Sequence, residues 1–271
     1  MTEDTNYLVA NYHTHTKRCQ HAVGEEREYI EQAIEQGIQI LGFSDHIPCP
    51  FKTEYISHIR MTMDEAEEYM ERLRKYQKEY RNDIHLYAGF EAEYIPEFYE
   101  EQIKLCDRIG CDYLILGQHF MRSEEFGPYS GGRNTSEELL IEYVDSIITA
   151  MKTGRFRYLA HPDLIYYVGE DEIYQLHMKR LCEAMKQMHI PMELNILGAR
   201  DQRQYPTERF WELAGQVGND VIIGIDAHSP NQIRQVNLEF GETRKENGYR
   251  ICKKIVDKYD LHQIHILDGL Q

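Results

Sequence analysis

Short apolar runs alternate with longer amphipathic stretches along most of the chain. The runs are rich in β-branched and aromatic side chains and are bounded by polar residues, which is typical of buried strands. We expect strands at residues 8–13, 39–45, 84–91, 113–119, 158–161, 191–195, 221–226 and 264–268.

Between these runs, apolar residues recur every three or four positions, which predicts helices. Gly37 follows the first of them and supplies a C-terminal stop. Thr62 with Glu65, and Thr135 with Glu138, have the spacing of a capping box at a helix start. We expect helices at residues 25–36, 63–81, 136–152, 171–189, 207–217 and 244–259.

Strands that alternate with helices in this way predict a mostly parallel sheet with crossover helices, an α/β fold. A closed barrel is the economical form of such a sheet, because it leaves no exposed edge. No linker, low-complexity tract or internal repeat interrupts the pattern. The length of 271 residues suits a single α/β barrel, so we expect one domain over residues 1–271.

Nearly every predicted strand ends in a side chain that can bind a metal ion. In a parallel barrel the carboxyl ends of the strands share one face, where active sites form. Imidazole and carboxylate groups are the usual ligands of zinc, iron and manganese. The residues at these ends are His13, His15, Asp45, His46, Glu91, Glu93, His119, His161, Glu193, Asn195, Asp226 and His228.

So many candidate ligands exceed what one tetrahedral ion needs, and we expect two or three ions that share a bridging carboxylate. His13 and His15 lie two positions apart on an extended strand, so both rings can face one ion. Taken alone, a histidine at a strand end is more often structural than a ligand. The histidines elsewhere are interpreted as structural or surface residues: His58, His85, His177, His189, His262 and His265.

Composition narrows the choice of partners and compartment. A formal net charge of −16 disfavours nucleic acid and anionic membrane surfaces, which require basic patches. No apolar run reaches the length of a membrane span, and the polar start of the chain lacks a signal peptide, so we expect a cytoplasmic protein. The six cysteines have no C-x-x-C spacing and are expected to be reduced thiols, with Cys19 incidental.

The motifs in their order along the chain resemble the PHP family, named for polymerase and histidinol phosphatase. They are HTH (13–15), SDH (44–46), Glu91, GQHF (117–120), AHPD (160–163), ELN (193–195) and DAHS (226–229). This resemblance implies a distorted (β/α)7 TIM-like barrel with a two- or three-metal centre of zinc, iron or manganese that hydrolyses phosphate esters. It implies a first ion on His13, His15, Glu91 and Asp226, a second on Glu91, His119 and His161, and a third on His21, His46 and His228.

The forms SDHIP, GQHF, HPDL and ELNILGAR are similar to the histidinol phosphatase branch of that family. This likeness implies that the small-molecule substrate is L-histidinol phosphate, in histidine biosynthesis. One alternative is a related phosphoesterase acting on nucleotides, oligonucleotides or phosphotyrosine, which a basic groove would favour. Others are a metal-binding barrel without catalysis and an amidohydrolase-type barrel, although the predicted strand ends carry no bridging lysine. The oligomeric state is not predicted.

Several residues are candidates for phosphate binding and proton transfer. Arg200 is the first candidate for the phosphate because guanidinium binds phosphate oxygens bidentately. Asp45 is the first candidate for the acid that protonates the leaving alcohol and His46 the second, while Asp45 could instead orient a ligand. The other candidates are Arg60, Arg133 and Arg157 for phosphate, Glu93, Glu193 and Asp163 for the substrate amine, and Phe51, Tyr94 and Phe120 for its ring.

Overall fold

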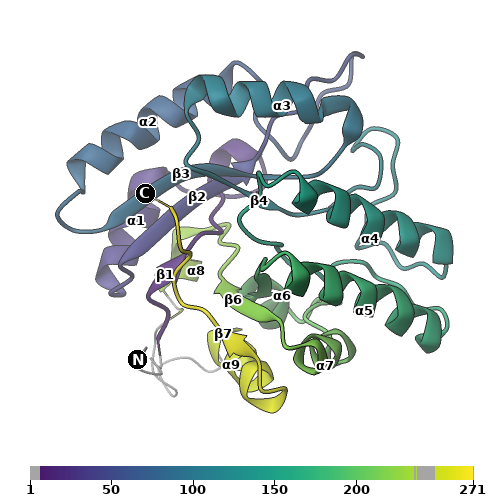
Figure 1. Cartoon of the computed structure of the whole chain (residues 1–271). Coiled ribbons are helices and arrows are strands. Elements are labelled where there is room, and N and C mark those ends of the chain that lie inside the picture. Colours follow the sequence, from purple (N-terminus) through teal and green to yellow (C-terminus); the bar gives the residue numbers. More distant parts are fainter. Residues whose placement is uncertain (1–6, 235, 237–247, 271) are drawn as a thin grey trace.

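The computed structural model describes residues 7–234, 236 and 248–270. Its paired strands are all parallel and form a curled sheet, with helices packed along the outside (Figure 1). The predicted α/β fold with a parallel sheet is confirmed. The strands are β1 (Ala10–Asn11), β2 (Ile40–His46), β3 (His85–Ala92), β4 (Tyr113–Leu116), β5 (Met192–Asn195), β6 (Asp220–Gly224) and β7 (His262–Gln263).

The strand pairing falls into two runs, β1-β2-β3-β4 and β5-β6-β7. Leu159 bridges both Leu116 at the end of β4 and Met192 at the start of β5. On the other side, Thr14 after β1 bridges Ala227 after β6. The two halves of the curled sheet are therefore joined by isolated bridges rather than by long ladders.

Two predicted strands are much shorter than expected. The strand at 8–13 is reduced to β1, because Asn11 turns its side chain to Thr14 Oγ1 (2.8 Å) and to the backbone N of Ile225 (2.8 Å). The strand at 158–161 is only the bridge at Leu159. His161 has a φ of 29°, which ends the extended backbone there.

The C-terminal segment also differs from the prediction. The last strand, β7, precedes residues 264–268, where a strand is predicted. Ile264 N still donates to Val221 O (2.8 Å), and the chain then leaves the sheet. The predicted helix at 244–259 is described from Gly248 onward, and residues 244–247 lie outside the described part.

The other predicted helices are present within two residues of their expected ends. One long helix, α3, was not predicted, although Pro96 at its first position and Gly110 after its last are ordinary start and stop signals. The helices are α1 (Glu26–Glu35), α2 (Glu65–Glu79), α3 (Pro96–Ile109), α4 (Glu137–Lys152), α5 (Asp171–Gln187), α6 (Ile196–Asp201), α7 (Glu208–Val217), α8 (Pro230–Arg234) and α9 (Gly248–Lys258), and a 3-10 turn, η1, spans Lys17–Cys19.

The bonds predicted between Thr62 and Glu65 are present, but the residue directly before α2 is Asp64, and the cap predicted for α4 is wrong. Thr62 N donates to the Glu65 carboxylate (2.8 Å), and Glu65 N donates back to Thr62 Oγ1 (3.4 Å). At α4 the cap is Ser136 rather than Thr135, since Ser136 Oγ accepts from Leu139 N (3.2 Å). A capping side chain must lie directly before the first helical turn, and the helix begins one residue later than the spacing suggested.

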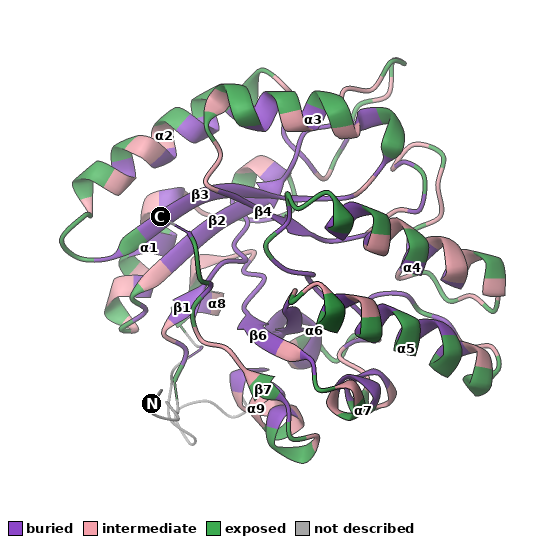
Figure 2. Cartoon of the chain, in the orientation of Figure 1, coloured by how far each residue is buried: buried purple, intermediate pink, exposed green. Residues whose placement is uncertain are grey.

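Strands β1 to β6 are mostly buried, β7 is not, and the helices expose one face to solvent (Figure 2). A cluster of tyrosines from β3, β4 and the neighbouring segments, together with small and aliphatic residues, fills the inside of the curl. Tyr113 OH donates to the carbonyl oxygens of Tyr12 (2.8 Å) and Phe43 (3.0 Å). Tyr158 OH donates to the buried Glu193 carboxylate (3.3 Å). This packed floor lies directly beneath the polar side chains at the carboxyl ends of the strands.

Candidate metal centre

The predicted strand-end residues converge on one cavity of about 400 Å³. β2 and β3 end in register, with His46 paired to Glu91, so these two side chains are neighbours at the same edge. The lining includes seven of the predicted ligands and several residues not predicted; it is His15, His21, His46, Ile59, Glu91, His119, Phe120, Tyr129, Leu197, Asp201, Arg203, Tyr205, Asp226, His228 and Gln232.

Glu91 lies at the centre of this cluster and faces histidines with both oxygens. Its Oε1 is 2.8 Å from His161 Nε2 and 3.5 Å from His119 Nε2. Its Oε2 is 3.4 Å from Nε2 of both His13 and His15 and 3.2 Å from His46 Nδ1. A carboxylate between two sets of imidazoles is the arrangement of a bridging ligand.

On the Oε2 side, His13 and His15 meet Asp226. Their Nε2 atoms are 3.1 Å apart and lie 3.5 Å and 3.2 Å from Asp226 Oδ1. A further pair faces the cavity mouth, where His21 Nε2 is 3.1 Å from His228 Nε2. Every residue that the family resemblance implies as a ligand is therefore in this one cluster.

The donor atoms fit divalent metal ions. Among the described residues, five of the ten buried polar atoms without a hydrogen-bond partner are here: His15 Nδ1, His46 Nδ1, Glu91 Oε2, His161 Nδ1 and Asp226 Oδ1. Buried polar atoms are normally paired, so such a concentration requires an explanation. Groups such as His13, His15 and Asp226 hold donor atoms within 4.8 Å of one another, close enough to share an ion.

Backbone geometry supports the same interpretation. His161 and Asp226 both have positive φ values, 29° and 54°. Non-glycine residues in this region are strained, and such strain persists mainly at functional sites. The strain directs these two side chains into the cluster rather than along the strand.

Burial and neighbouring charges favour the metal-binding protonation state of Glu91, His46 and His228. In contrast, nearby carboxylates raise the pKa of His13, His15 and His119 above its ordinary value despite burial. Burial would raise the pKa of Glu91, but the histidines His119, His13 and His46 hold it well below its ordinary value. Burial, with the charge of His15, lowers the pKa of His46 well below its ordinary value and that of His228 to about 3. The central carboxylate is therefore ionised and these two imidazoles are neutral.

A layer of buried polar residues orients the ligands from behind. Glu193 Oε1 lies 2.9 Å from His13 Nδ1, so the opposite nitrogen of that ring faces Glu91. Asn195 Nδ2 donates to Glu193 (2.9 Å) and to Asp226 (3.1 Å). Fixing the far nitrogen of a histidine selects its tautomer and ring orientation.

Glu93 is committed to the same layer rather than to the cavity. It lies 3.2 Å from His119 Nδ1 and accepts from the buried Arg60 (3.0 Å). Burial would raise the pKa of Glu93, but the charge of Arg60 lowers it to about 2. Arg60 also donates to Glu124 (2.8 Å), so this buried guanidinium joins the loop after β2 to the segment after His119.

Asp45 is likewise turned away from the cavity. Its two oxygens accept from Thr16 N (2.8 Å) and Thr16 Oγ1 (2.7 Å), and Oδ1 is 3.9 Å from His15 Nδ1. Burial raises the pKa of Asp45 to about 7. This geometry corresponds to the orienting role that the sequence left open for Asp45.

The other predicted substrate residues are not all brought together. Phe120 lines the cavity, whereas Phe51 packs against Phe98 (ring centroids 5.4 Å apart) and Tyr94 against Tyr99 (5.1 Å). Asp163 is buried and accepts from Thr207 Oγ1 (3.1 Å) at the start of α7, so it fastens a loop.

Two neighbouring arginines differ in whether they reach the cavity, and the one predicted to bind phosphate is not the one that does. Arg200 is paired with the adjacent Asp201 (2.7 Å) and does not line the cavity, whereas Arg203 does. α6 ends at Gln202, which has a φ of 53°, and this left-handed residue redirects the chain so that Arg203 faces the centre. Arg133 lies outside the lining as well.

Sequence reasoning also missed residues around the mouth. Tyr129 and Tyr205 line the cavity, and Arg203 Nη1 is 3.4 Å from Tyr205 OH. Cys19, expected to be incidental, has its sulfur 3.9 Å from His21 Nε2. Burial would raise the pKa of the Cys19 thiol, but the neighbouring imidazoles of His15 and His21 lower it to about 6.

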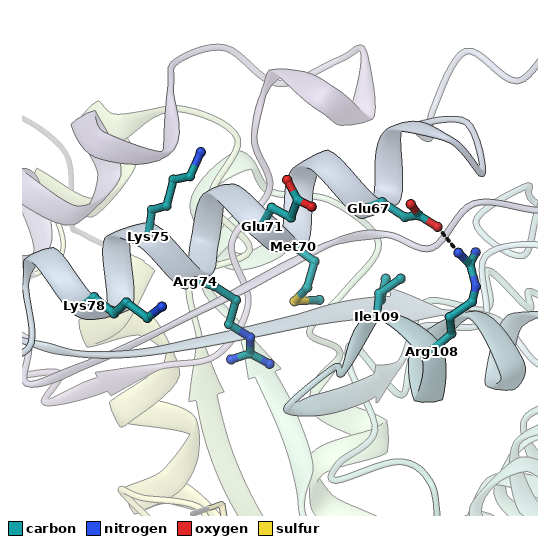
Figure 3. Close-up of a pocket in the computed structure, with 8 residues that line it drawn as sticks. All are labelled: Glu67, Met70, Glu71, Arg74, Lys75, Lys78, Arg108 and Ile109. Atoms are coloured by element: carbon teal, nitrogen blue, oxygen red, sulfur yellow. Dashed lines mark ion pairs between the residues drawn. The ribbon is translucent and has the colours of Figure 1, made fainter.

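Two of the larger cavities lie away from this centre. One, of about 560 Å³, is a groove between α2 and α3 in which Arg108 pairs with Glu67 (Figure 3). The other, of about 740 Å³, lies at the amino ends of β5 and β6 and is lined by Arg157, which is therefore at the wrong end of the sheet for the predicted phosphate role. Neither cavity has more than one histidine among its described lining residues.

Fold and site together define an α/β protein that builds a divalent-metal centre at the carboxyl ends of a parallel sheet. The chain belongs to the PHP domain family, whose model matches residues 11–196. In the described part of the chain, no helix combines the length and apolar character that crossing a membrane requires.

Individual relatives cover most of the chain. A protein of Deinococcus radiodurans named probable histidinol-phosphatase is 27% identical over 247 residues, 88% of this chain and 92% of its own length. A probable histidinol-phosphatase of Schizosaccharomyces pombe is 26% identical over 94% of this chain and 88% of its own length. The structure of histidinol phosphate phosphatase from Lactococcus lactis, complexed with zinc, L-histidinol and phosphate, matches with a TM-score of 0.70 at 16% identity over 97% of both chains, a likeness of fold.

Proposed function

We propose that the chain is a metal-dependent phosphatase that hydrolyses L-histidinol phosphate to L-histidinol and phosphate, acting in the cytoplasm in histidine biosynthesis. The observation that carries this proposal is Glu91, whose two oxygens each face separate histidines in a buried cluster. Such a cluster suits two or three divalent ions close together. The names of the relatives that cover most of the chain supply the substrate.

The fold that we propose is the distorted (β/α)7 barrel, a single domain over residues 1–271. The bridges at Leu159 and between Thr14 and Ala227 support it, because they join the two halves of the sheet on both sides. In this arrangement segment 158–161 takes the place of a strand between β4 and β5. All strand ends then surround the cavity, as they do in parallel barrels.

We propose three sets of metal ligands, each made of residues whose donor atoms lie close together. His13, His15 and Asp226 would hold one ion with Glu91, and His119 and His161 would hold a second with the same carboxylate. His21, His46 and His228 would hold a third nearer the mouth. Zinc, iron or manganese bound here supplies Lewis acidity toward water and the phosphate oxygens.

Arg203 is the cation that we propose for the substrate phosphate, in place of Arg200. It lines the cavity opposite the histidines, and Tyr205 fixes its position. A guanidinium can donate two parallel hydrogen bonds to phosphate oxygens, whose charge spreads in the transition state. Phe120 and Tyr129, whose ring centroids are 5.6 Å apart, offer an aromatic wall for the imidazole of the substrate.

For the proton on the leaving alcohol, the geometry disfavours Asp45, and His46 can serve only where it is not a permanent metal ligand. His46 lines the cavity, whereas both oxygens of Asp45 are occupied by Thr16. Asp45 would then act as a positioning residue behind His15. An Asp45→Asn variant is expected to bind metal less tightly, and a variant with full metal affinity and slow turnover would restore Asp45 as the acid.

Phosphate release by the purified, metal-loaded protein tests the proposal. L-histidinol phosphate should be cleaved with a kcat/KM far above those for p-nitrophenyl phosphate, AMP and phosphotyrosine. Cleavage of another ester, with L-histidinol phosphate ignored, would retain the metal chemistry and overturn the substrate. No hydrolysis by fully loaded protein would overturn the enzyme itself.

A further inference from the structure

Cys19 is the last residue of η1 and is completely buried two positions before His21. Thr16 fixes this turn, because its side chain accepts from Arg18 N and its carbonyl accepts from Cys19 N (3.1 Å). The turn directs the sulfur at His21 Nε2, 3.9 Å away. That nitrogen is the one that faces His228 Nε2 at 3.1 Å.

The three donor atoms have the spacing of ligands around one ion. Cys19 Sγ and the ring nitrogens of His21 and His228 all lie within 4.8 Å of one another. In a tetrahedral zinc site, bond lengths near 2.05 Å to nitrogen and 2.3 Å to sulfur separate two nitrogens by about 3.3 Å and a nitrogen from a sulfur by about 3.6 Å. The observed 3.1 Å and 3.9 Å are within a few tenths of these values.

A second observation points to a missing ligand beside the thiol. One ring nitrogen of His15 lies within 4.8 Å of both Cys19 Sγ and an Asp45 oxygen. His15 Nδ1 is buried and has no hydrogen-bond partner, and it lies 3.9 Å from Asp45 Oδ1. The side chain of His15 is only 1% exposed, so water does not pair this nitrogen. Unpaired buried nitrogen next to sulfur is a costly arrangement for a side chain whose only role is packing.

Most of the other cysteines of this protein pack within or against its main hydrophobic core. Cys106, Cys182 and Cys252 are members of the main hydrophobic core, and Cys111 packs against it. Cys19 belongs to none of the hydrophobic clusters of the described residues, although it is as buried as they are. Its surroundings are imidazole and carboxylate groups.

We propose that the sulfur of Cys19 is a ligand of the third metal position, together with His21 and His228. On binding, the thiol proton is released to solvent and the thiolate binds the ion. A soft thiolate favours zinc over manganese at this position, whereas the positions around Glu91 have only nitrogen and oxygen donors. The inference rests on the proposed function only in requiring that the centre bind divalent metal.

Cobalt titration of the metal-free protein tests this inference. Cobalt takes zinc sites, and a sulfur ligand adds an intense sulfur-to-cobalt charge-transfer absorption in the near ultraviolet. We expect this band in the wild type, its loss in Cys19→Ser, and its retention in Cys111→Ser, a matched control far from the centre. Cys19→Ser should also bind its last equivalent of metal at least about 10-fold more weakly, with the other equivalents unchanged.

The outcomes separate this inference from the proposed function. Full cobalt binding without the band, or a band that persists in Cys19→Ser, would overturn the sulfur ligand and leave the phosphatase proposal intact. No cobalt binding by a folded wild type would overturn both. Circular dichroism of both variants verifies the fold, and Cys19→Ala, which must also lack the band, serves as a second variant if Cys19→Ser is unfolded.

Discussion

Among single residues, two glycines are as necessary to the centre as its ligands. A Cβ on Gly117 would lie 1.9 Å from Glu91 Oε1, and a Cβ on Gly224 would lie 1.9 Å from Glu193 Oε1. The carboxylates of Glu91 and Glu193 therefore occupy space that only glycine leaves free. Neither glycine has a positive φ, so the requirement is room rather than backbone conformation.

Gly117→Ala should therefore displace Glu91 and impair the centre. We expect a loss of at least about 100-fold in kcat/KM, because small misplacements of catalytic groups have effects of this size. Gly110→Ala is the control: Gly110 has a φ of 73° and open space around it, so strain lowers stability without changing activity. Kinetics with metal analysis tests the pair, and an active, metal-replete Gly117→Ala variant contradicts the packing argument.

Arg203 and Arg200 offer a direct comparison of neighbouring cations. Arg203→Ala should lower kcat/KM by about 10²–10³-fold, the effect of losing one charged donor to the transition state. Arg200→Ala should change it little, since Arg200 pairs with Asp201 outside the cavity. Steady-state kinetics of both variants decides between them, and the reverse ranking would restore Arg200 as the phosphate ligand.

At the scale of elements, the segment between β2 and α2 is fastened to the segment after β4 by buried charge. Arg60 is 1% exposed and pairs with Glu93 and Glu124, while Glu124 also accepts from Ser57 Oγ (2.8 Å). One guanidinium thus holds two loops and the carboxylate that orients His119. The arrangement of these loops follows from this network rather than from apolar packing alone.

Removing Arg60 should consequently be costly. Arg60→Met leaves two carboxylates without their cation, and we expect about 3–5 kcal/mol of lost unfolding free energy. Arg155→Met, which breaks the exposed pair with Asp107, should lower it by less than about 1 kcal/mol. Urea denaturation of both variants measures the difference, and equal losses would mean that the buried network contributes no more than a surface pair.

The start of α4 gives a second test at this scale. Ser136→Ala removes the side chain that accepts from Leu139 N, and should lower the free energy of unfolding by about 1 kcal/mol. Thr135→Ala, one residue earlier and exposed, should lower it by less than about 0.5 kcal/mol. A larger effect at Thr135 would reinstate the cap that spacing predicts.

The convergence of the strand-end side chains was predictable because each of them follows a recognisable apolar run, and parallel strands bring such ends together. The position of Arg203 was not predictable, because Arg200 lies in the same polar stretch and only the left-handed Gln202 selects which of the two arginines faces the cavity. Cys19 had no spacing signal, since its distant neighbour His228 is brought to it by tertiary packing. α3 could have been predicted from Pro96 and Gly110.

At the scale of the whole molecule, the chain has a high negative net charge, and its candidate metal centre contains both histidines and carboxylates. The chain carries a net charge of −16, and its buried donor atoms include several without partners. Such atoms disfavour the metal-free fold, and bound cations offset that cost. Folding stability and metal binding are therefore coupled in this protein.

That coupling predicts a thermal shift. Zinc at 100 times its Kd should stabilise the metal-free protein by about 2.7 kcal/mol for each ion bound. For a chain of this size, one such ion raises the unfolding midpoint by about 5–10 °C. Magnesium is the control, because it prefers oxygen donors and should shift the midpoint little. Equal shifts with both ions would contradict a centre built mainly from histidines.

We propose that Glu91 bridges a multinuclear metal centre, and the number of metal ions bound per chain is the most direct test. Wild type and Glu91→Gln would be freed of metal, reloaded with zinc, desalted and analysed for metal per chain. We expect about two to three equivalents of zinc per chain in the wild type. Glu91→Gln should lose at least about one of them, since the amide cannot bridge two ions. An undiminished metal content in folded Glu91→Gln, or a folded wild type that retains none, would contradict it.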